Sequence, residues 1–78
     1  MEIFGEKYTQ AEIEILELAT ITVYIAARAG ETQLYDIFQD FENRGLFITD
    51  NSDPFMIAEI TDKGYNVVQE INRKRDLN

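Results

Sequence analysis

The spacing of large apolar residues between Thr32 and Arg44 constrains the fold more than any other feature of the chain. They follow the i, i+3, i+4, i+7 pattern of an amphipathic helix: Leu34, Ile37, Phe38 and Phe41. The Thr32 hydroxyl can cap the start of this helix, and Gly45 can end it because glycine adopts the left-handed conformation of a helix stop. We therefore expect a helix from Thr32 to Arg44 with one apolar and one polar face.

An earlier helix is predicted over residues 10–19. Thr9 and Glu12 have the spacing of a capping box, and Tyr8 and Ile13 have that of a hydrophobic staple. The expected inner face consists of Ala11, Ile15, Leu16, Leu18 and Ala19. The following segment, "TITVYIAARAG", mixes residues that favour strands with alanines that favour helices. We interpret it as a short helix over residues 22–29 ended by Gly30, with one continuous helix from residue 10 to residue 29 as the alternative.

A β-hairpin is predicted over residues 46–60. Two β-rich runs, "LFIT" and "FMIAEIT", flank the turn sequence "DNSDP". Thr61 then caps a last helix, "DKGYNVVQEINRKRD", whose inner face is expected to hold Tyr65, Val68 and Ile71 with Val67 alongside. The order is helix, helix, helix, hairpin, helix. This order predicts a single α+β domain, mostly α, that spans residues 1–78 as a winged helix-turn-helix.

The residue content argues against catalysis. The chain has no His and no Cys, which removes the usual general base, the thiol nucleophile and the common zinc ligands. The single serine, Ser52, lies in a predicted turn, and no glycine-rich phosphate loop is present. A 78-residue chain has a thin core that does not enclose a deep pocket. We expect neither an enzyme nor a bound cofactor.

The chain also lacks the signals of a membrane or secreted protein. Its start, "MEIFGEKY", has no basic region of the kind that opens a signal peptide. The most apolar run, residues 13–27, is interrupted by Glu14 and Glu17 and is too short to span a bilayer. We expect a cytoplasmic protein.

Two segments resemble a known family. The stretch "LYDIFQDFENRGLF" is similar to the recognition-helix signature of winged-helix transcription regulators of the PadR and MarR type, which falls here on Leu34-Tyr35, Phe41-Glu42 and Gly45-Leu46-Phe47. The stretch "ITDKGYNVV" resembles the segment that ends their wing, on Ile60, Thr61, Lys63 and Gly64. The resemblance covers roughly Thr9 to Ile71.

The resemblance implies a third helix that inserts in the major groove of DNA and a wing that lies along the backbone. The residues that would face bases are Thr32, Asp36, Gln39 and Asn43, with Tyr35 near phosphate. Glutamine and asparagine pair with adenine, and aspartate accepts from cytosine. The family also tends to dimerise through extra terminal helices, and this chain has little beyond its last one. A homodimer of this chain would share the apolar faces of its first and C-terminal helices.

The charge opposes binding to DNA. Net charge is −8. Residues 31–45 hold four acids and one base, residues 46–61 three acids and no base, and residues 62–78 three acids and four bases. The wing tip consists of Asp50, Asn51, Ser52 and Asp53. Affinity for DNA comes largely from phosphate neutralisation, for which the candidates are Arg44, Arg73, Lys74 and Arg75.

Alternative interpretations remain for each of these segments. The "RKR" of residues 73–75 could complement the dipole of the last helix rather than contact phosphate. The "DNSD" segment has oxygen ligands for a cation, but a turn stabilised by side-chain hydrogen bonds fits better, and we expect no metal. The acids Asp36, Asp40, Glu42, Asp50 and Asp53 could face a basic partner or serve solubility. Tyr24, Tyr35 and Phe55 are candidate anchors for such a contact.

Three functions follow in order of preference. The first is a small regulatory protein that binds a basic protein partner through its acidic third helix, including Asp40, and its wing. The second is a dimeric, sequence-specific DNA-binding regulator. The third is a structural or homodimerisation module.

Overall fold

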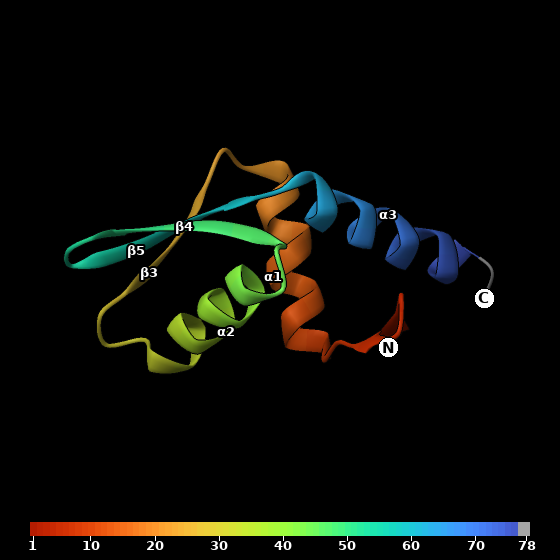
Figure 1. Ribbon diagram of the computed structural model, residues 1–78, viewed down its shortest axis with the longest axis horizontal. Helices are drawn as coiled ribbons and strands as arrows, with labels where there is room; N and C mark the ends of the chain where they lie inside the picture. The colour runs from red at the N-terminus through yellow and green to blue at the C-terminus, as the bar shows by residue number, and fades with distance from the viewer. Residues whose placement is uncertain (77–78) are drawn as a thin grey trace.

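The computed structural model describes residues 1–76 of the chain and contains three helices and two antiparallel sheets (Figure 1). In chain order the elements are β1 (Glu2–Ile3), β2 (Glu6–Lys7), α1 (Gln10–Ile21), β3 (Ile25–Arg28), α2 (Thr32–Asn43), β4 (Phe47–Ser52), β5 (Phe55–Ile60) and α3 (Asp62–Asp76). Helices take up about half of the chain, so the α+β class is confirmed.

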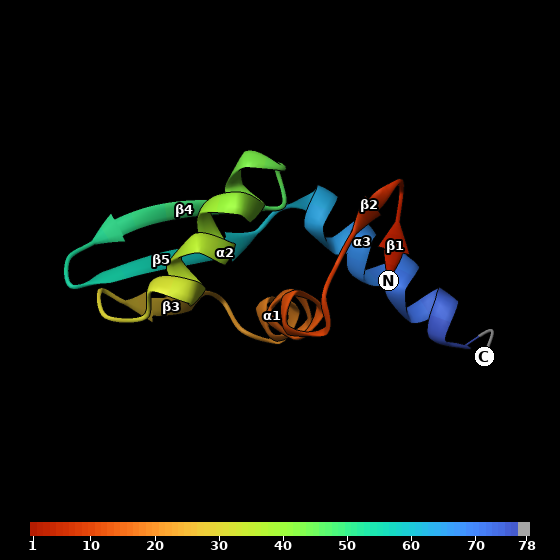
Figure 2. The same ribbon diagram turned by 90° about the horizontal axis from the view of Figure 1, so that it is seen from below.

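A three-stranded sheet of order β3-β5-β4 forms one end of the molecule, and α2 lies across one of its faces (Figure 2). α1 and α3 pack against each other and against β5 at the other end. Three fully buried rings join the layers, with Phe47 edge-on to Phe38 and Phe41 at centroid distances of 5.8 and 5.1 Å. Such edge-to-face aromatic pairs add to the free energy of burying their apolar surface.

The capping box at the start of α1 is confirmed. The Glu12 backbone N donates to Thr9 Oγ1 (3.2 Å), and the Thr9 backbone N donates to Glu12 Oε1 (2.8 Å). The inner face of α1 differs from the prediction. Ile13, Leu16 and Ala19 are buried, whereas Ala11 and Leu18 are exposed, because α1 turns its Ile13 side toward α3 and β5.

The predicted helix over residues 22–29 is wrong, and so is the alternative of one helix through Ala29. α1 ends at Ile21, Thr22 has extended backbone angles, and β3 pairs antiparallel with β5 in the register Ile25↔Ala58 and Ala27↔Met56. The strand preference of the β-branched residues prevails because β5 supplies hydrogen-bonding partners for this segment. A strand therefore precedes α2, and the predicted helix-turn-helix pair is not formed.

The prediction for α2 is largely confirmed, with a correction at its start. Phe38 and Phe41 are buried, and the other two residues of the apolar stripe, Leu34 and Ile37, are half-buried. The N-cap is Glu31 and no side chain caps the helix, so the predicted capping by Thr32 is wrong.

The end of α2 leads directly into the hairpin. Gly45 follows α2 with a φ of +78°, as expected of a helix stop. The β4–β5 hairpin is confirmed, but its first strand extends further than predicted. Asp50, Asn51 and Ser52 belong to β4, and only Asp53 and Pro54 form the turn.

The last helix begins where its cap predicts. The Gly64 backbone N donates to Thr61 Oγ1 at 3.2 Å, and Val67, Val68 and Ile71 are buried. Tyr65 is not on the inner face as predicted. It is 42% exposed, and its hydroxyl donates to the Thr20 carbonyl at the end of α1 (3.5 Å). Gly64 occupies the buried position instead.

A two-stranded sheet before α1 was not predicted from the sequence. β1 and β2 are joined by Phe4 and Gly5, which both have positive φ angles of 51° and 82°. The Met1 amino group donates to the Tyr8 carbonyl (2.9 Å), which closes this hairpin against the start of α1.

Candidate functional site

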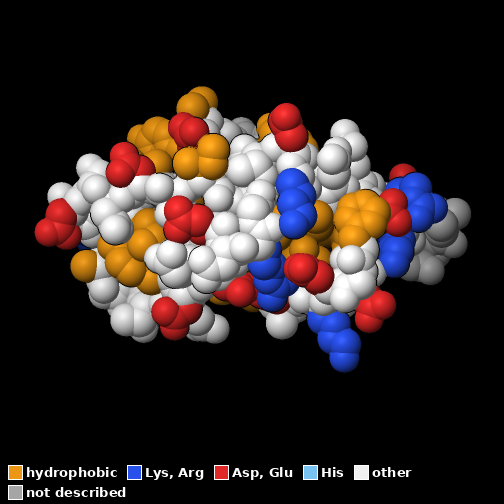
Figure 3. All heavy atoms as spheres, in the orientation of Figure 1, with side chains coloured by type: hydrophobic (Ala, Val, Ile, Leu, Met, Phe, Trp, Pro, Cys, Tyr) orange, Lys and Arg blue, Asp and Glu red, His pale blue; other side chains and the backbone are white. Residues whose placement is uncertain are grey.

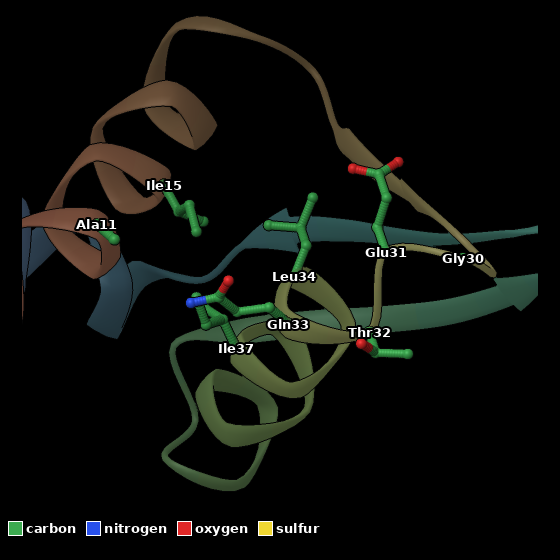
Figure 4. A pocket seen from close by; sticks show the side chains of 8 residues that line it. All are labelled: Ala11, Ile15, Gly30, Glu31, Thr32, Gln33, Leu34 and Ile37. Carbon is green, nitrogen blue, oxygen red and sulfur yellow. The ribbon is translucent and has the colours of Figure 1, made fainter.

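Two adjoining hollows lie between α1 and the N-terminal half of α2. The first has a volume of about 450 Å³ and is lined by Ala11, Ile15, Gly30, Glu31, Thr32, Gln33, Leu34 and Ile37 (Figure 4). The second, of about 300 Å³, is lined by Thr9, Ala11, Glu12, Gln33, Asp36, Ile37 and Asp40. Because they share three lining residues, we treat them as one site, the α1–α2 groove.

The floor of the α1–α2 groove is apolar. Ile15 extends from α1 toward Leu34 and Ile37 on α2, and Ala11 lies one helical turn before Ile15 (Figure 4). The three larger side chains pack against the core on one side and remain half-exposed on the other. Burying the exposed part of such side chains yields roughly 25 cal/mol per Å² of apolar surface. The floor can therefore hold an apolar side chain of a partner.

The rim of the α1–α2 groove is acidic. It carries Glu12, Glu31, Asp36 and Asp40, and within the described part of the chain no Lys or Arg lines either hollow. Glu12 is fixed by the capping box, and Glu31 Oε1 accepts from the Arg28 backbone N at 3.1 Å. Asp36 is exposed and makes no ion pair within residues 1–76. The site thus presents carboxylates around an apolar floor.

Arg44, the one basic residue at the C-terminal end of α2, interacts with groups of the same chain. Its Nη2 atom lies 2.9 Å from Asp40 Oδ2, its Nη1 atom lies 3.3 Å from Glu6 Oε2, and its guanidinium lies 5.3 Å from the Tyr8 ring centroid. Partial burial alone would lower the pKa of Arg44, but Asp40, Tyr8 and Glu6 together raise it. Arg44 is therefore turned toward the β1–β2 hairpin rather than outward.

The other phosphate-contact candidates also have partners within the chain. Arg73 pairs with Glu70 one turn earlier, and Arg75 pairs with Glu17 on α1 at 2.9 Å. Lys74 Nζ donates to the Glu2 carbonyl at 2.7 Å. In Figure 3 the Lys and Arg side chains gather toward the α3 end of the molecule, while acidic side chains spread over the sheet end.

The outward face of α2 agrees with the helical wheel. Thr32, Asp36, Gln39 and Asn43 are exposed, whereas Tyr35 is half-buried against the core. The Gln39 amide donates to Glu42 Oε2 at 2.8 Å. The structure places Asp36 and Asp40 at the α1–α2 groove, and Gln39 and Asn43 outside its lining.

The predicted wing residues do not join this site. Asp50, Asn51, Ser52 and Asp53 are exposed at the end of the β4–β5 hairpin and do not line the groove. Within residues 1–76, no group of three or more carboxylates could hold a metal ion.

The accessible apolar surface of the groove was not predicted from the sequence. It consists of Ala11, Ile15, Leu34 and Ile37. We assigned them to the inner faces of their helices, which share this apolar patterning. The available signals were the position of Ile37 at one edge of the α2 stripe and that of Leu34 in the first turn of α2.

Comparison with protein-family models, with curated proteins and with solved structures finds no match to this chain. Among the described residues 1–76, none of the helices combines the length and apolar character needed to cross a membrane.

Proposed function

We propose that this protein is a small interaction module that binds a basic, amphipathic segment of a partner protein in the α1–α2 groove. The observation that carries the proposal is the combination of an apolar floor with a rim of four carboxylates and no cation among the lining residues. An apolar side chain of the partner would rest on Ile15, Leu34 and Ile37. Lysines or arginines beside it would face Glu31 and Asp36.

The two parts of the groove have different roles. Floor contacts supply most of the affinity, because burial of one Leu-sized side chain is worth about 1.5–3 kcal/mol. Rim ion pairs are solvated, so each is worth only roughly 0.2–1 kcal/mol. They raise the association rate and exclude acidic partners instead. Binding should therefore weaken with added salt mainly through slower association.

The test uses a pair of labelled helical peptides with the same apolar stripe, one flanked by lysines and the other by glutamates. Fluorescence anisotropy should detect binding of the lysine peptide alone. The substitution Ala11→Arg places a cation on the floor and should weaken binding by roughly tenfold or more, which corresponds to about 1.4 kcal/mol. Ala29→Arg, at an exposed alanine outside the groove, is the matched control and should leave binding unchanged.

Two results would overturn this function. One is equal binding of both peptides, and the other is equal sensitivity of binding to the two arginine substitutions. Far-UV circular dichroism of each variant reports whether it is folded.

A second candidate is a sequence-specific DNA-binding regulator with a winged-helix-related domain. It is favoured by the exposure of Gln39 and Asn43 on α2 and by the hairpin that directly follows this helix. It requires Arg44 or the residues 73–75 to exchange their internal partners for phosphates. A mobility shift with random duplex at low salt, lost on Arg44→Glu together with Arg73→Glu, would favour it over the peptide-binding function, because binding to random duplex depends on phosphate contacts.

A further inference from the structure

The three-stranded sheet has a second face, which points away from α2. Side chains alternate between the faces of a sheet, and Ala27, Phe47, Met56 and Ala58 are buried on the inner one. The other set defines the outer sheet face: Ala26, Arg28, Ile48, Asp50, Ser52, Phe55, Ile57 and Glu59. Figures 1 and 2 show no helix over this face.

The outer sheet face is more apolar than a solvated face needs to be. Ile48 is 63% exposed, Phe55 is 36% exposed and Ile57 is half-exposed. Antiparallel sheets with one wet face ordinarily alternate apolar inward and polar outward residues. Here apolar residues occupy outward positions on each of the three strands, with Ala26 paired to Ile57 across β3 and β5. A contact with another surface would remove them from water.

The arrangement of charges on this face limits which kind of partner can bind it. The Arg28 guanidinium lies 5.7 Å from the Phe55 ring centroid, and within residues 1–76 it makes no ion pair. The other three arginines each pair with a carboxylate. Asp50 and Glu59 also lack a cation partner in the described chain. One unpaired cation beside unpaired acids is complementary to a copy of itself, whereas a uniformly basic partner would oppose Arg28.

We propose that the outer sheet face binds the same face of a second copy in a two-fold symmetric dimer. Arg28 on β3 pairs with Phe55, and Asp50 on β4 pairs with Ile57, so the two charged residues flank β5 two positions apart along the strand. In a two-fold contact centred between Phe55 and Ile57 on β5, Arg28 of one protomer faces Asp50 of its partner and the reverse. Isologous contacts of this kind are the commonest way in which identical chains associate.

This dimer leaves the α1–α2 groove open, because the groove lies on the side of the sheet where α2 packs. The assembly would display two grooves and bind a partner with two basic segments more tightly than one groove can. The proposal is independent of peptide binding, since the monomer carries a complete groove.

Sedimentation velocity of the full chain over a concentration series tests the dimer. We expect a shift from the mass of one chain to twice that mass as concentration rises. Ile48→Glu should raise the dimer dissociation constant by roughly tenfold or more. Leu18→Glu changes a similarly exposed apolar residue on α1, which is 47% exposed, and should leave the dissociation constant unchanged.

A charge exchange tests the Arg28–Asp50 contact itself. Arg28→Asp should weaken the dimer. The double substitution Arg28→Asp with Asp50→Arg should restore it, because the same ion pairs then form across the two-fold axis with their two charges exchanged. Amide chemical shifts of the unaltered protein should change on dilution at β3, β4 and β5. A single-chain mass at every concentration, a dimer weakened equally by Ile48→Glu and Leu18→Glu, or no restoration by the double substitution would overturn the proposal.

Discussion

The two ends of the molecule use their charges in opposite ways. Residues 31–60, which form α2 and the β4–β5 hairpin, contain seven acids and one base, and that base points toward the β1–β2 hairpin. Residues 61–78 contain three acids and four bases, and all four bases contact groups of the same chain: Lys63, Arg73, Lys74 and Arg75. Lys74 and Arg75 join α3 to elements that are distant in sequence. Unpaired acids at the sheet end are free for partners.

This difference separates charged groups that stabilise the fold from charged groups that are available to bind other molecules. Arg75 links α3 to α1 through Glu17, and Lys74 links α3 to β1. A small domain has little core, so such contacts add to its stability. The same contacts withdraw the cations that DNA binding would need, which is why the sheet end and the α1–α2 groove are the better candidates for interaction.

The largest expected effect lies where the two ends meet, at Gly64 in the first turn of α3. A Cβ atom at Gly64 would lie 2.6 Å from the Leu46 carbonyl oxygen and 2.5 Å from Ile60 Cγ1. Gly64→Ala should therefore lower the free energy of unfolding by about 1–3 kcal/mol, as overpacking typically does. Urea denaturation measures the change. Gly30→Ala is the control, because a Cβ there meets nothing within 4 Å. Equal effects of the two substitutions would show that α3 is not packed this closely on Leu46.

The second-largest effect on stability tests whether Arg44 stabilises the fold in the way that the cations of α3 do. Arg44→Ala removes two ion pairs and the contact with the Tyr8 ring, and it leaves Asp40 and Glu6 without their partner. We expect a loss of about 1–2 kcal/mol, since partly exposed pairs and cation–π contacts each contribute up to roughly 1 kcal/mol. Thermal denaturation at low salt measures the loss.

The control for Arg44 is Lys7, an exposed base on β2 with no ion pair in the described residues. Lys7→Ala should change stability by less than about 0.5 kcal/mol, as is usual at such surface positions. If Arg44→Ala costs no more than Lys7→Ala, the side chain is free to face DNA.

Local signals in the sequence predicted the elements that form locally. The capping box of Thr9 and Glu12, the apolar stripe of α2 and the glycine stop at Gly45 act within a few residues, and each is found in the structure. Thr61 as the cap of α3 belongs to the same group. Hydrogen bonding and helix periodicity operate over these short separations, so a single sequence contains the necessary information.

Features that depend on distant partners were not predicted. β3 is a strand because Ile25 pairs with Ala58, and nothing within residues 20–30 identifies that partner. Arg44 and Glu6 are 38 positions apart, and Arg75 and Glu17 are 58 apart. The α1–α2 groove depends on how two helices cross, so its floor was assigned to the core. Among the acidic residues of α2, Asp36 is exposed as expected, whereas Asp40 and Glu42 are half-buried. The apolar surface beside them was not predicted.

The smallest effect contrasts a paired carboxylate at the α3 end with an unpaired one at the groove. The hydrogen bond from Arg73 lowers the pKa of Glu70 below its ordinary value of 4.5. A carboxyl group whose pKa is lowered by folding stabilises the folded state above its unfolded-state pKa, and this contribution disappears as pH falls through the folded-state pKa. The stability difference between the unaltered protein and Glu70→Gln should therefore be positive at neutral pH and vanish in acid below pH 4.5.

Asp36→Asn removes an exposed carboxylate without a cation partner, so at neutral pH it should leave stability unchanged or slightly raised, because the net negative charge falls. Denaturant unfolding of the three proteins across this pH range measures both differences. If the unaltered protein is more stable than Asp36→Asn at neutral pH, and this difference vanishes in acid, the acids beside the α1–α2 groove stabilise the fold. They are then not free to bind a basic partner.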